Sequence, residues 1–135
     1  VCGINAVPTE FLSRYCSLKV DALEQDRWFH VTDMIEKPAA GQEFSNYSIL
    51  GRVVLPPSIY EILDNTPPGA GGEIQLTDAM CVLAKNGGMT GVDFIGKRYD
   101  MGNKLEVAKA GVEMAMKHPV IGEEFTAYLK TLLTK

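Results

Sequence analysis

The sequence has 135 residues, of which 46% are apolar and 22% are charged, and its formal net charge is −4. This composition is typical of one globular domain, or of a piece of a larger protein, that buries an apolar core. The negative charge argues against general binding to nucleic acid or to a membrane surface, although a local cluster of Lys and Arg could still hold a phosphate. No run of 18 apolar residues occurs, so we expect no membrane span.

The cysteines indicate a reducing compartment. Cys2, Cys16 and Cys81 are odd in number, widely spaced and set among apolar neighbours. They are typical of reduced, buried thiols rather than of a disulfide framework or a zinc site. The first residues lack the basic segment and long apolar stretch of a secretory signal. These features predict a cytoplasmic protein. His30 and His118 have no Cys or His at ligand spacing, so we expect neither to bind a metal.

Strand and helix patterns alternate along the chain, which predicts an α/β layered fold. The run Trp28–Lys37 is rich in aromatic and β-branched residues and predicts a strand that Pro38 ends. The next strand, over 47–55, is apolar on both faces and is expected to be buried between layers. Residues 9–27 are interpreted as a surface excursion with one helical turn. Further strands are expected over 1–7 and 89–99, and helices after Pro57, after Thr77, after Asn103 and over 123–133.

Local signals predict how these helices begin, end and pack. Thr77 and Asp78 offer oxygens that could cap one helix, which Asn86-Gly87-Gly88 would end. Asn103 with Glu106 resembles a capping box at the start of the next helix, and Asp100-Met101-Gly102 before it predicts a tight turn. Four apolar residues of this helix are expected to share its inner face: Leu105, Ala108, Val112 and Ala115.

A glycine-rich segment lies at the centre of the chain. Two prolines, Pro67 and Pro68, precede Gly69-Ala-Gly-Gly-Glu73, and a predicted helix follows. Glycines allow positive φ and a close approach of the backbone to a ligand, and a loop that leads into a helix start is a common way to hold a polar ligand. The alternative is a connector with a helix cap. The pattern matches neither a dinucleotide fingerprint nor a phosphate-binding Gly-Lys-Ser/Thr loop.

Two short charged segments are candidates for chemistry. Glu36 and Lys37 end a predicted strand, and adjacent strand residues point to opposite faces unless the strand twists or bulges there. With such a bulge, Glu36 could accept sugar hydroxyls while Lys37 offsets phosphate charge; otherwise they are a solvated pair. Asp100 is expected at the carboxyl end of a strand, where ligands gather in open α/β sheets, and could hold Mg²⁺. The alternative is a turn aspartate that caps a helix.

Four segments in order resemble bacterial UTP–glucose-1-phosphate uridylyltransferase. They are Met-Ile-Glu-Lys-Pro (34–38), Ile-Leu-Gly-Arg-Val-Val-Leu-Pro-Pro (49–57), Gly-Ala-Gly-Gly-Glu-Ile-Gln-Leu-Thr-Asp-Ala (69–79) and Lys-Arg-Tyr-Asp-Met-Gly-Asn-Lys (97–104). The closing residues 118–125 are similar to that family's tail. The third segment is the most specific of these, whereas Glu-Lys-Pro alone would fit several sugar nucleotidyltransferases. One departure is Glu106, where the family has glycine.

The resemblance implies a reaction in which UTP and glucose 1-phosphate give UDP-glucose and pyrophosphate, with Mg²⁺ as cofactor. It implies that Lys37 is a catalytic residue that contacts the sugar phosphate and offsets its charge. It also implies that Glu36 binds glucose hydroxyls and that Asp100 is one of two metal aspartates. Gly72 and Glu73 would shape the sugar pocket. It also implies a homo-oligomer.

The nucleotide loop, the base-recognition residues and the first metal aspartate of that family do not occur in this sequence. We therefore interpret residues 1–135 as the C-terminal, sugar-phosphate-binding and oligomerisation portion of a Rossmann-like nucleotidyltransferase fold, a mixed sheet flanked by helices. We expect this portion to be inactive by itself. The alternatives are a thymidylyl- or guanylyltransferase of the same superfamily and a non-catalytic sugar-phosphate-binding module.

Overall fold

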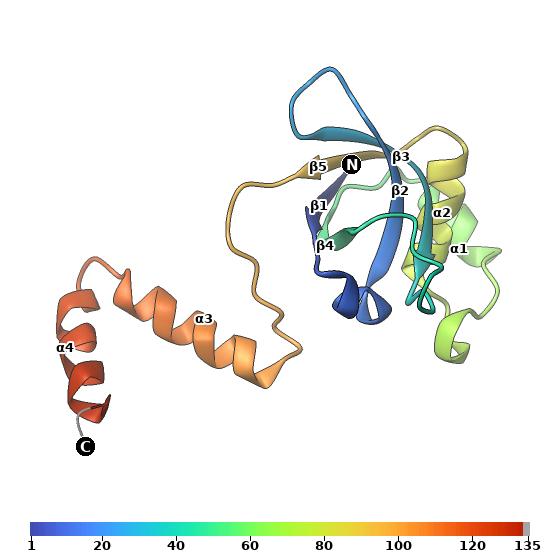
Figure 1. The fold of residues 1–135 in the computed structure, drawn as a ribbon. Coiled ribbons are helices and arrows are strands. Elements are labelled where there is room, and N and C mark those ends of the chain that lie inside the picture. The colour runs from blue at the N-terminus through green and yellow to red at the C-terminus, as the bar shows by residue number, and fades with distance from the viewer. Residues whose placement is uncertain (134–135) are drawn as a thin grey trace. The chain divides into compact units, whose positions relative to one another are not determined.

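The computed structural model describes residues 1–133; residues 134–135 lie outside the described part. The chain divides into two units, Val1–Ile95 and a second that begins at Gly96. The first unit contains a mixed five-stranded sheet of order β2-β3-β5-β1-β4 (Figure 1). Its strands are β1 (Cys2–Ala6), β2 (Cys16–Ala22), β3 (Trp28–Glu36), β4 (Tyr47–Val53) and β5 (Thr90–Asp93). Only β1 and β5 run parallel. The predicted mixed sheet is confirmed.

Two helices of the first unit, α1 (Ile59–Asp64) and α2 (Leu76–Lys85), complete its core. Helix α2 packs against β3, and α1 packs against α2 (Figure 1). The sheet contributes Ile4, Leu18 and Val31 to this core, each fully buried, and α2 contributes Ala79 and Met80. Short 3₁₀ helices, η1 (Thr9–Arg14) and η2 (Ala70–Gly72), lie in the connections.

The sheet curls so that its two edge strands approach each other. The hydroxyl of Ser17 on β2 donates to the carbonyl oxygen of Ser45 over 2.8 Å. The backbone N–H of Ile49 on β4 donates to the sulfur of Cys16 over 3.3 Å. These bonds hold β2 close to β4, and Cys16 and Ile49 both line the cavity described below.

The structure corrects several predictions for the strands. Residues 9–27 contain the expected helical turn as η1, but they also contain β2, which the sequence reading missed. The interpretation of a surface excursion was wrong because Cys16, Ser17 and Leu18 of this strand are buried, while Lys19 and Asp21 are exposed. Strand β5 is only four residues long instead of spanning 89–99. Strand β4 is not buried on both faces: it is an edge strand of this sheet, and Val54 just beyond it is 74% exposed.

Helix α2 starts differently from the prediction. Its N-cap is Gln75, in an extended conformation and without a side-chain capping bond, so Thr77 and Asp78 lie inside the first turn rather than capping it. Its end is as predicted, because the N–H groups of Gly87 and Gly88 donate to the carbonyl oxygens of Ala84 and Leu83.

The second unit contains helices α3 (Lys104–Met116) and α4 (Gly122–Leu133), which pack on each other. The side chain of Asn103 accepts hydrogen bonds from the N–H groups of Leu105 and Glu106, which confirms the predicted cap. Glu106 does not complete the capping box; its carboxylate pairs with Lys109 at 2.8 Å. The expected inner face of α3 was also wrong, since no residue of α3 is buried and Leu105 is 62% exposed.

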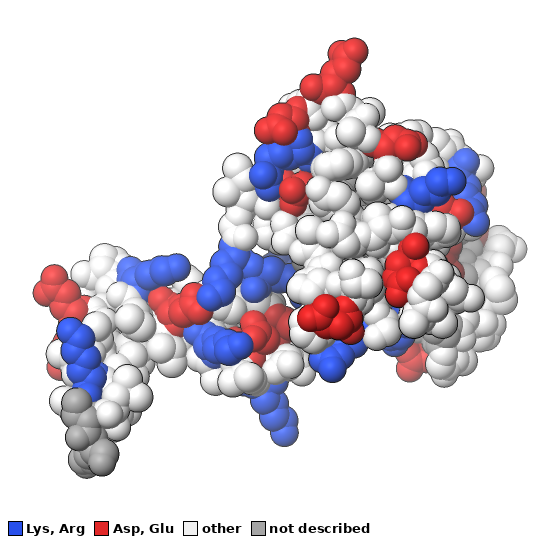
Figure 2. Space-filling view, in the orientation of Figure 1, with Lys and Arg blue, Asp and Glu red and all other residues white. Residues whose placement is uncertain are grey.

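The helices and the surface charge each bear on function. Across residues 1–133, no helix combines the length and the apolar character that a membrane crossing requires. On the face drawn in Figure 2, basic and acidic side chains are interspersed. This face shows no stripe of a single sign of the kind that nucleic-acid-binding proteins present.

Candidate functional site

The site is built where β3 ends. Glu36 is the last residue of β3 and pairs with Cys16 across the ladder. Lys37 then adopts a left-handed conformation with φ of 47°, and its N–H donates to the carbonyl oxygen of Tyr15 over 2.8 Å. The strand alternation therefore stops at Glu36. Glu36 lines a cavity, whereas Lys37 is exposed and is not part of that cavity's wall.

The cavity has a volume of about 290 Å³ and is formed by the curled end of the sheet and the start of α2. Its wall combines residues from η1, β2, β3, β4 and α2 that are far apart in the sequence. They are Arg14, Tyr15, Cys16, Glu36, Ile49, Gly51, Arg52, Val53, Leu76, Thr77 and Met80. A cavity with an apolar floor and a few charged groups is the usual form of a small-molecule site.

A bulge in β4 brings Arg52 to this wall. Opposite β1, Cys2 faces Val53 and Ile4 faces Ile49, so β4 carries extra residues between these two pairs. Within the bulge Gly51 has φ of 88° and Arg52 has φ of 69°. Bulges redirect side chains and are common beside functional sites. Arg52 belongs to the segment 49–57 that resembles the family, and it was not among the predicted site residues. The signal in the sequence is a Gly-Arg pair inside an apolar run.

The charged side chains of the wall form no ion pair with one another. Among residues 1–133, no side-chain hydrogen bond or ion pair involves Arg14, Arg52 or Glu36. The guanidinium of Arg14 lies 5.5 Å from the centre of the Phe11 ring, which restricts its motion. Arg14, Arg52 and Glu36 are thus the charged residues of this wall, and both arginines are also exposed.

Cys16 in the same wall is a neutral thiol. Burial raises the pKa of the Cys16 thiol, and the nearby charge of Glu36 acts in the same direction, against hydrogen bonds from Ser48 and from the N–H of Ile49. Because the thiolate is the nucleophilic form, Cys16 serves here as packing rather than as a nucleophile.

The glycine-rich loop shapes this end of the site indirectly. The N–H of Gly69 donates to the carbonyl oxygen of Glu73 over 2.8 Å, and the N–H of Gly72 donates to that of Gly69 over 2.9 Å. A Cβ on Gly69 would collide with the carboxylate of Asp78, so this glycine permits the loop to close on the first turn of α2. Neither Gly72 nor Glu73 is part of the cavity wall, and Glu73 is exposed. The loop instead sets the position of Leu76 and Thr77.

Asp100 lies in the second unit, in the tight turn that was predicted. Its Oδ1 accepts a hydrogen bond from the N–H of Gly102 over 2.9 Å, and its carbonyl oxygen accepts one from Asn103 over 3.0 Å. The expectation that Asp100 ends a strand was wrong, because β5 stops at Asp93. Among residues 1–133, no three His, Cys, Asp or Glu side chains cluster in a way that could hold a metal ion. One carboxylate does not fit the near-octahedral demand of Mg²⁺ by itself.

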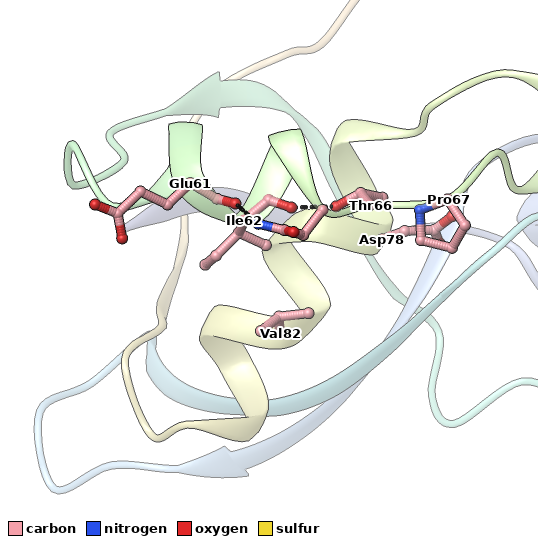
Figure 3. Close-up of a pocket in the computed structure, with 7 residues that line it drawn as sticks. Glu61, Ile62, Thr66, Pro67, Asp78 and Val82 are labelled. Carbon is pink, nitrogen blue, oxygen red and sulfur yellow. Dashed lines mark hydrogen bonds between the residues drawn. The ribbon is translucent and has the colours of Figure 1, made fainter.

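A second cavity, of about 380 Å³, lies between α1 and α2 (Figure 3). Its wall is mostly apolar, with Ile62, Pro67 and Val82 among its residues. Glu61 and Asp78 belong to this wall, although the carboxylate of Glu61 points away from the other residues drawn, and no basic residue lines it. It contains none of the predicted site residues. The smaller cavity at Glu36, which carries charges of both signs, is therefore the candidate functional site.

Comparison with known proteins identifies relatives for nearly the whole chain. No family model matches it. UTP–glucose-1-phosphate uridylyltransferase from Staphylococcus epidermidis is 39% identical over 132 residues, which are 98% of this chain and 46% of that protein. The protein of the same name from Streptococcus pneumoniae is 38% identical over 127 residues, 94% of this chain and 42% of that protein.

Solved structures agree. A UDP-glucose pyrophosphorylase complexed with UDP-glucose matches 96% of this chain and 44% of its own, with a TM-score of 0.75 and 33% identity. The UTP-bound enzyme from Acinetobacter baumannii matches 95% of this chain and 44% of its own, with a TM-score of 0.80 and 32% identity. The chain thus spans less than half the length of the relatives that it matches. It is a homologue of the UTP–glucose-1-phosphate uridylyltransferases, and it corresponds in sequence and fold to part of such a protein.

Proposed function

We propose that this chain is part of a nucleotidyltransferase that forms UDP-glucose and pyrophosphate from UTP and glucose 1-phosphate. The observation that carries the proposal is the similarity over 94–98% of the chain to proteins of that name. The solved relatives that hold UDP-glucose and UTP support the same substrates. We place this reaction in the cytoplasm, consistent with three free cysteines.

In this proposal the chain supplies the sugar-phosphate part of the site. Glu36, which lines the cavity, accepts hydrogen bonds from glucose hydroxyls. Lys37, which is exposed and directly follows β3, offsets charge on the phosphate as it attacks the nucleotide. Gly72 and Glu73 keep the loop that sets the start of α2. Nucleotide binding is assigned to residues outside this sequence, because none of its segments has the form of a nucleotide loop.

Mg²⁺ is the cofactor that the resemblance implies, and when bound it would neutralise phosphate charge. Asp100 would supply one oxygen ligand. One carboxylate is not enough to hold Mg²⁺ by itself. The roles of this chain in the reaction are therefore to bind the substrate and to neutralise phosphate charge.

We also propose a homo-oligomer. Helix α4 leaves Tyr128 56% exposed and Leu132 49% exposed. Apolar groups gathered on one helix are typical of surfaces that pair with another chain.

The test is pyrophosphate release from UTP and glucose 1-phosphate, measured on a longer protein that contains this chain. Lys37→Ala is expected to lower kcat/KM by about 100-fold, or ~3 kcal/mol, as is typical for the loss of one charge-stabilising contact. Lys19→Ala, which removes an exposed lysine of β2 outside the cavity wall, is the matched control and should change little. Wild-type activity in Lys37→Ala would refute the assigned role. Residues 1–135 alone are expected to release no pyrophosphate above the blank.

A further inference from the structure

We propose that Glu113 of α3 is a positioning residue for Asp100. It holds residues 97–99 on the surface of α3 and thereby fixes the turn that presents the Asp100 carboxylate. The inference rests on the proposed function for the role of Asp100 as one oxygen ligand of Mg²⁺. It goes beyond that proposal in naming the group that keeps Asp100 in place. All of these residues belong to the second unit of the chain.

Local hydrogen bonds fix the turn at Asp100 on its C-terminal side. The Oδ1 of Asp100 accepts a bond from the N–H of Gly102 over 2.9 Å, and its carbonyl oxygen accepts one from the N–H of Asn103 over 3.0 Å. Asn103 in turn caps α3. On the N-terminal side, residues 94–99 belong to no helix or strand. The path of that segment therefore depends on its contacts with other parts of the unit.

Glu113 supplies such contacts. The hydroxyl of Tyr99 donates to Oε2 of Glu113 over 2.7 Å, and the ammonium group of Lys97 pairs with Oε1 of the same carboxylate. The Lys97 ammonium group also lies 5.2 Å from the centre of the Tyr99 ring. A single exposed ion pair is worth little, whereas one carboxylate that accepts from two donors, which also contact each other, restricts all three side chains.

The exposure of α3 agrees with this arrangement. Glu106, Ala110 and Glu113 are half-buried, and their spacing of four and three residues places them on one face of the helix. Every other residue of α3 is exposed except Ala115. The half-buried face thus consists of two carboxylates and one methyl group. Because it offers so little apolar surface, polar bonds rather than packing hold residues 97–99 there.

The position of Asp100 depends on these bonds because Tyr99 precedes it directly in the chain. If Tyr99 leaves α3, the backbone of Asp100 is restrained less on its N-terminal side and its carboxylate takes more positions. A ligand group acts when it is held within about 0.5 Å of the productive geometry, and Mg²⁺ tolerates little departure from an octahedron. The loss of Glu113 should therefore weaken cation binding while it leaves turnover at saturating cation nearly unchanged.

The test uses a longer protein that contains this chain, with Mn²⁺ alone as the probe and electron paramagnetic resonance to measure free Mn²⁺. Glu113→Ala is expected to raise the dissociation constant of Mn²⁺ by about fivefold. Tyr99→Phe should raise it less, and the double variant should bind Mn²⁺ no more weakly than Glu113→Ala, because both changes remove the same contact. Glu113→Gln keeps an acceptor for the Tyr99 hydroxyl and should recover part of the affinity.

Pyrophosphate release by the same protein separates positioning from a general structural defect. In Glu113→Ala, the Mg²⁺ concentration that gives half-maximal activity should rise by about the same factor as the Mn²⁺ dissociation constant, whereas kcat at saturating Mg²⁺ should stay within about twofold of wild type.

Glu106→Ala is the matched control. It removes a carboxylate from the same face of α3, but that carboxylate pairs with Lys109 along the helix. It should leave Mn²⁺ binding unchanged. Hydrogen exchange of the N–H groups of Gly102 and Asn103 reports on the turn without any metal. It should be faster in Glu113→Ala and unchanged in Glu106→Ala.

The inference is overturned if Asp100→Asn weakens Mn²⁺ binding while Glu113→Ala, still folded by circular dichroism, binds Mn²⁺ within twofold of wild type. It is also overturned if Glu106→Ala weakens binding as much as Glu113→Ala does, or if Glu113→Ala leaves hydrogen exchange in the turn unchanged. Failure of the proposed function gives a different result. Asp100→Asn then leaves Mn²⁺ binding unchanged while Glu113→Ala still speeds exchange, so the positioning role stands and the metal role of Asp100 fails.

Discussion

Gly91 is the position where the structure predicts the sharpest packing effect. It lies on β5 between Cys2 of β1 and Phe29 of β3, and it is buried. A Cβ added there would lie 2.9 Å from Cδ1 of Ile4 and 3.2 Å from Cγ2 of Val31. Both neighbours are fully buried, so neither can swing into solvent. Gly91→Ala therefore forces a shift inside a close-packed core.

The expected cost follows from these contacts. Overpacking a core by a small group lowers the free energy of unfolding by about 1–3 kcal/mol. Replacing Gly by Ala also reduces the entropy of the unfolded chain, which offsets roughly 0.5–1 kcal/mol of this loss. We expect Gly91→Ala to lower the free energy of unfolding by about 1–2 kcal/mol. Ile4→Val removes the Cδ1 atom at 2.9 Å, and alone it should cost about 0.5–1.5 kcal/mol. Combined with Gly91→Ala it should recover part of the loss, giving a coupling of about 1 kcal/mol.

Urea unfolding followed by circular dichroism measures all four proteins of this cycle. Ile59→Val provides the matched control, since Ile59 is also buried but lies on α1 and is not among the atoms nearest to Gly91. Its effect should add to that of Gly91→Ala within about 0.5 kcal/mol. If the Ile4 pair is equally additive, or if Gly91→Ala is as stable as the wild type, the packing argument is wrong.

Three further predictions concern individual side chains. Asn103→Ala should destabilise the start of α3 by about 1 kcal/mol, because it removes the acceptor of two helix N–H groups. Faster hydrogen exchange in the first turn of α3 would report this loss, and Asn103→Asp, which keeps the cap, is the control. Hydrogen bonds from Lys97 and Tyr99 lower the pKa of Glu113. The contribution of ionised Glu113 to folding stability is therefore present above the ordinary carboxyl pKa range and is lost as the pH falls through the lowered pKa. An NMR titration that shows an ordinary or raised pKa for Glu113 would contradict this. Burial raises the pKa of the Cys2 thiol to about 11, so iodoacetamide at pH 8 should label Cys2 only after unfolding, as mass spectrometry can show.

Several features follow from the sequence alone because they depend on neighbours along the chain. Strand β3 is set by aromatic and β-branched residues that Pro38 follows. The end of α2 depends on Gly87, whose φ of 75° suits glycine. The Asp100 turn and the Asn103 cap close through hydrogen bonds between residues two or three apart. Such local interactions form in the same way whatever the rest of the chain does.

The cavity is different, because only tertiary structure decides its wall. Glu36 was identified from its motif, but Arg14 and Arg52 join it through the pairing of β2 with β3, the curl that brings β2 to β4, and the bulge at position 52. The alternation of side chains along a strand says which residues share a face; it does not say which strands pair or in what register. The sequence therefore identifies individual candidate residues such as Glu36. The residues that share its cavity are decided by the pairing of strands that are far apart in the sequence, because burial of the common core selects one register.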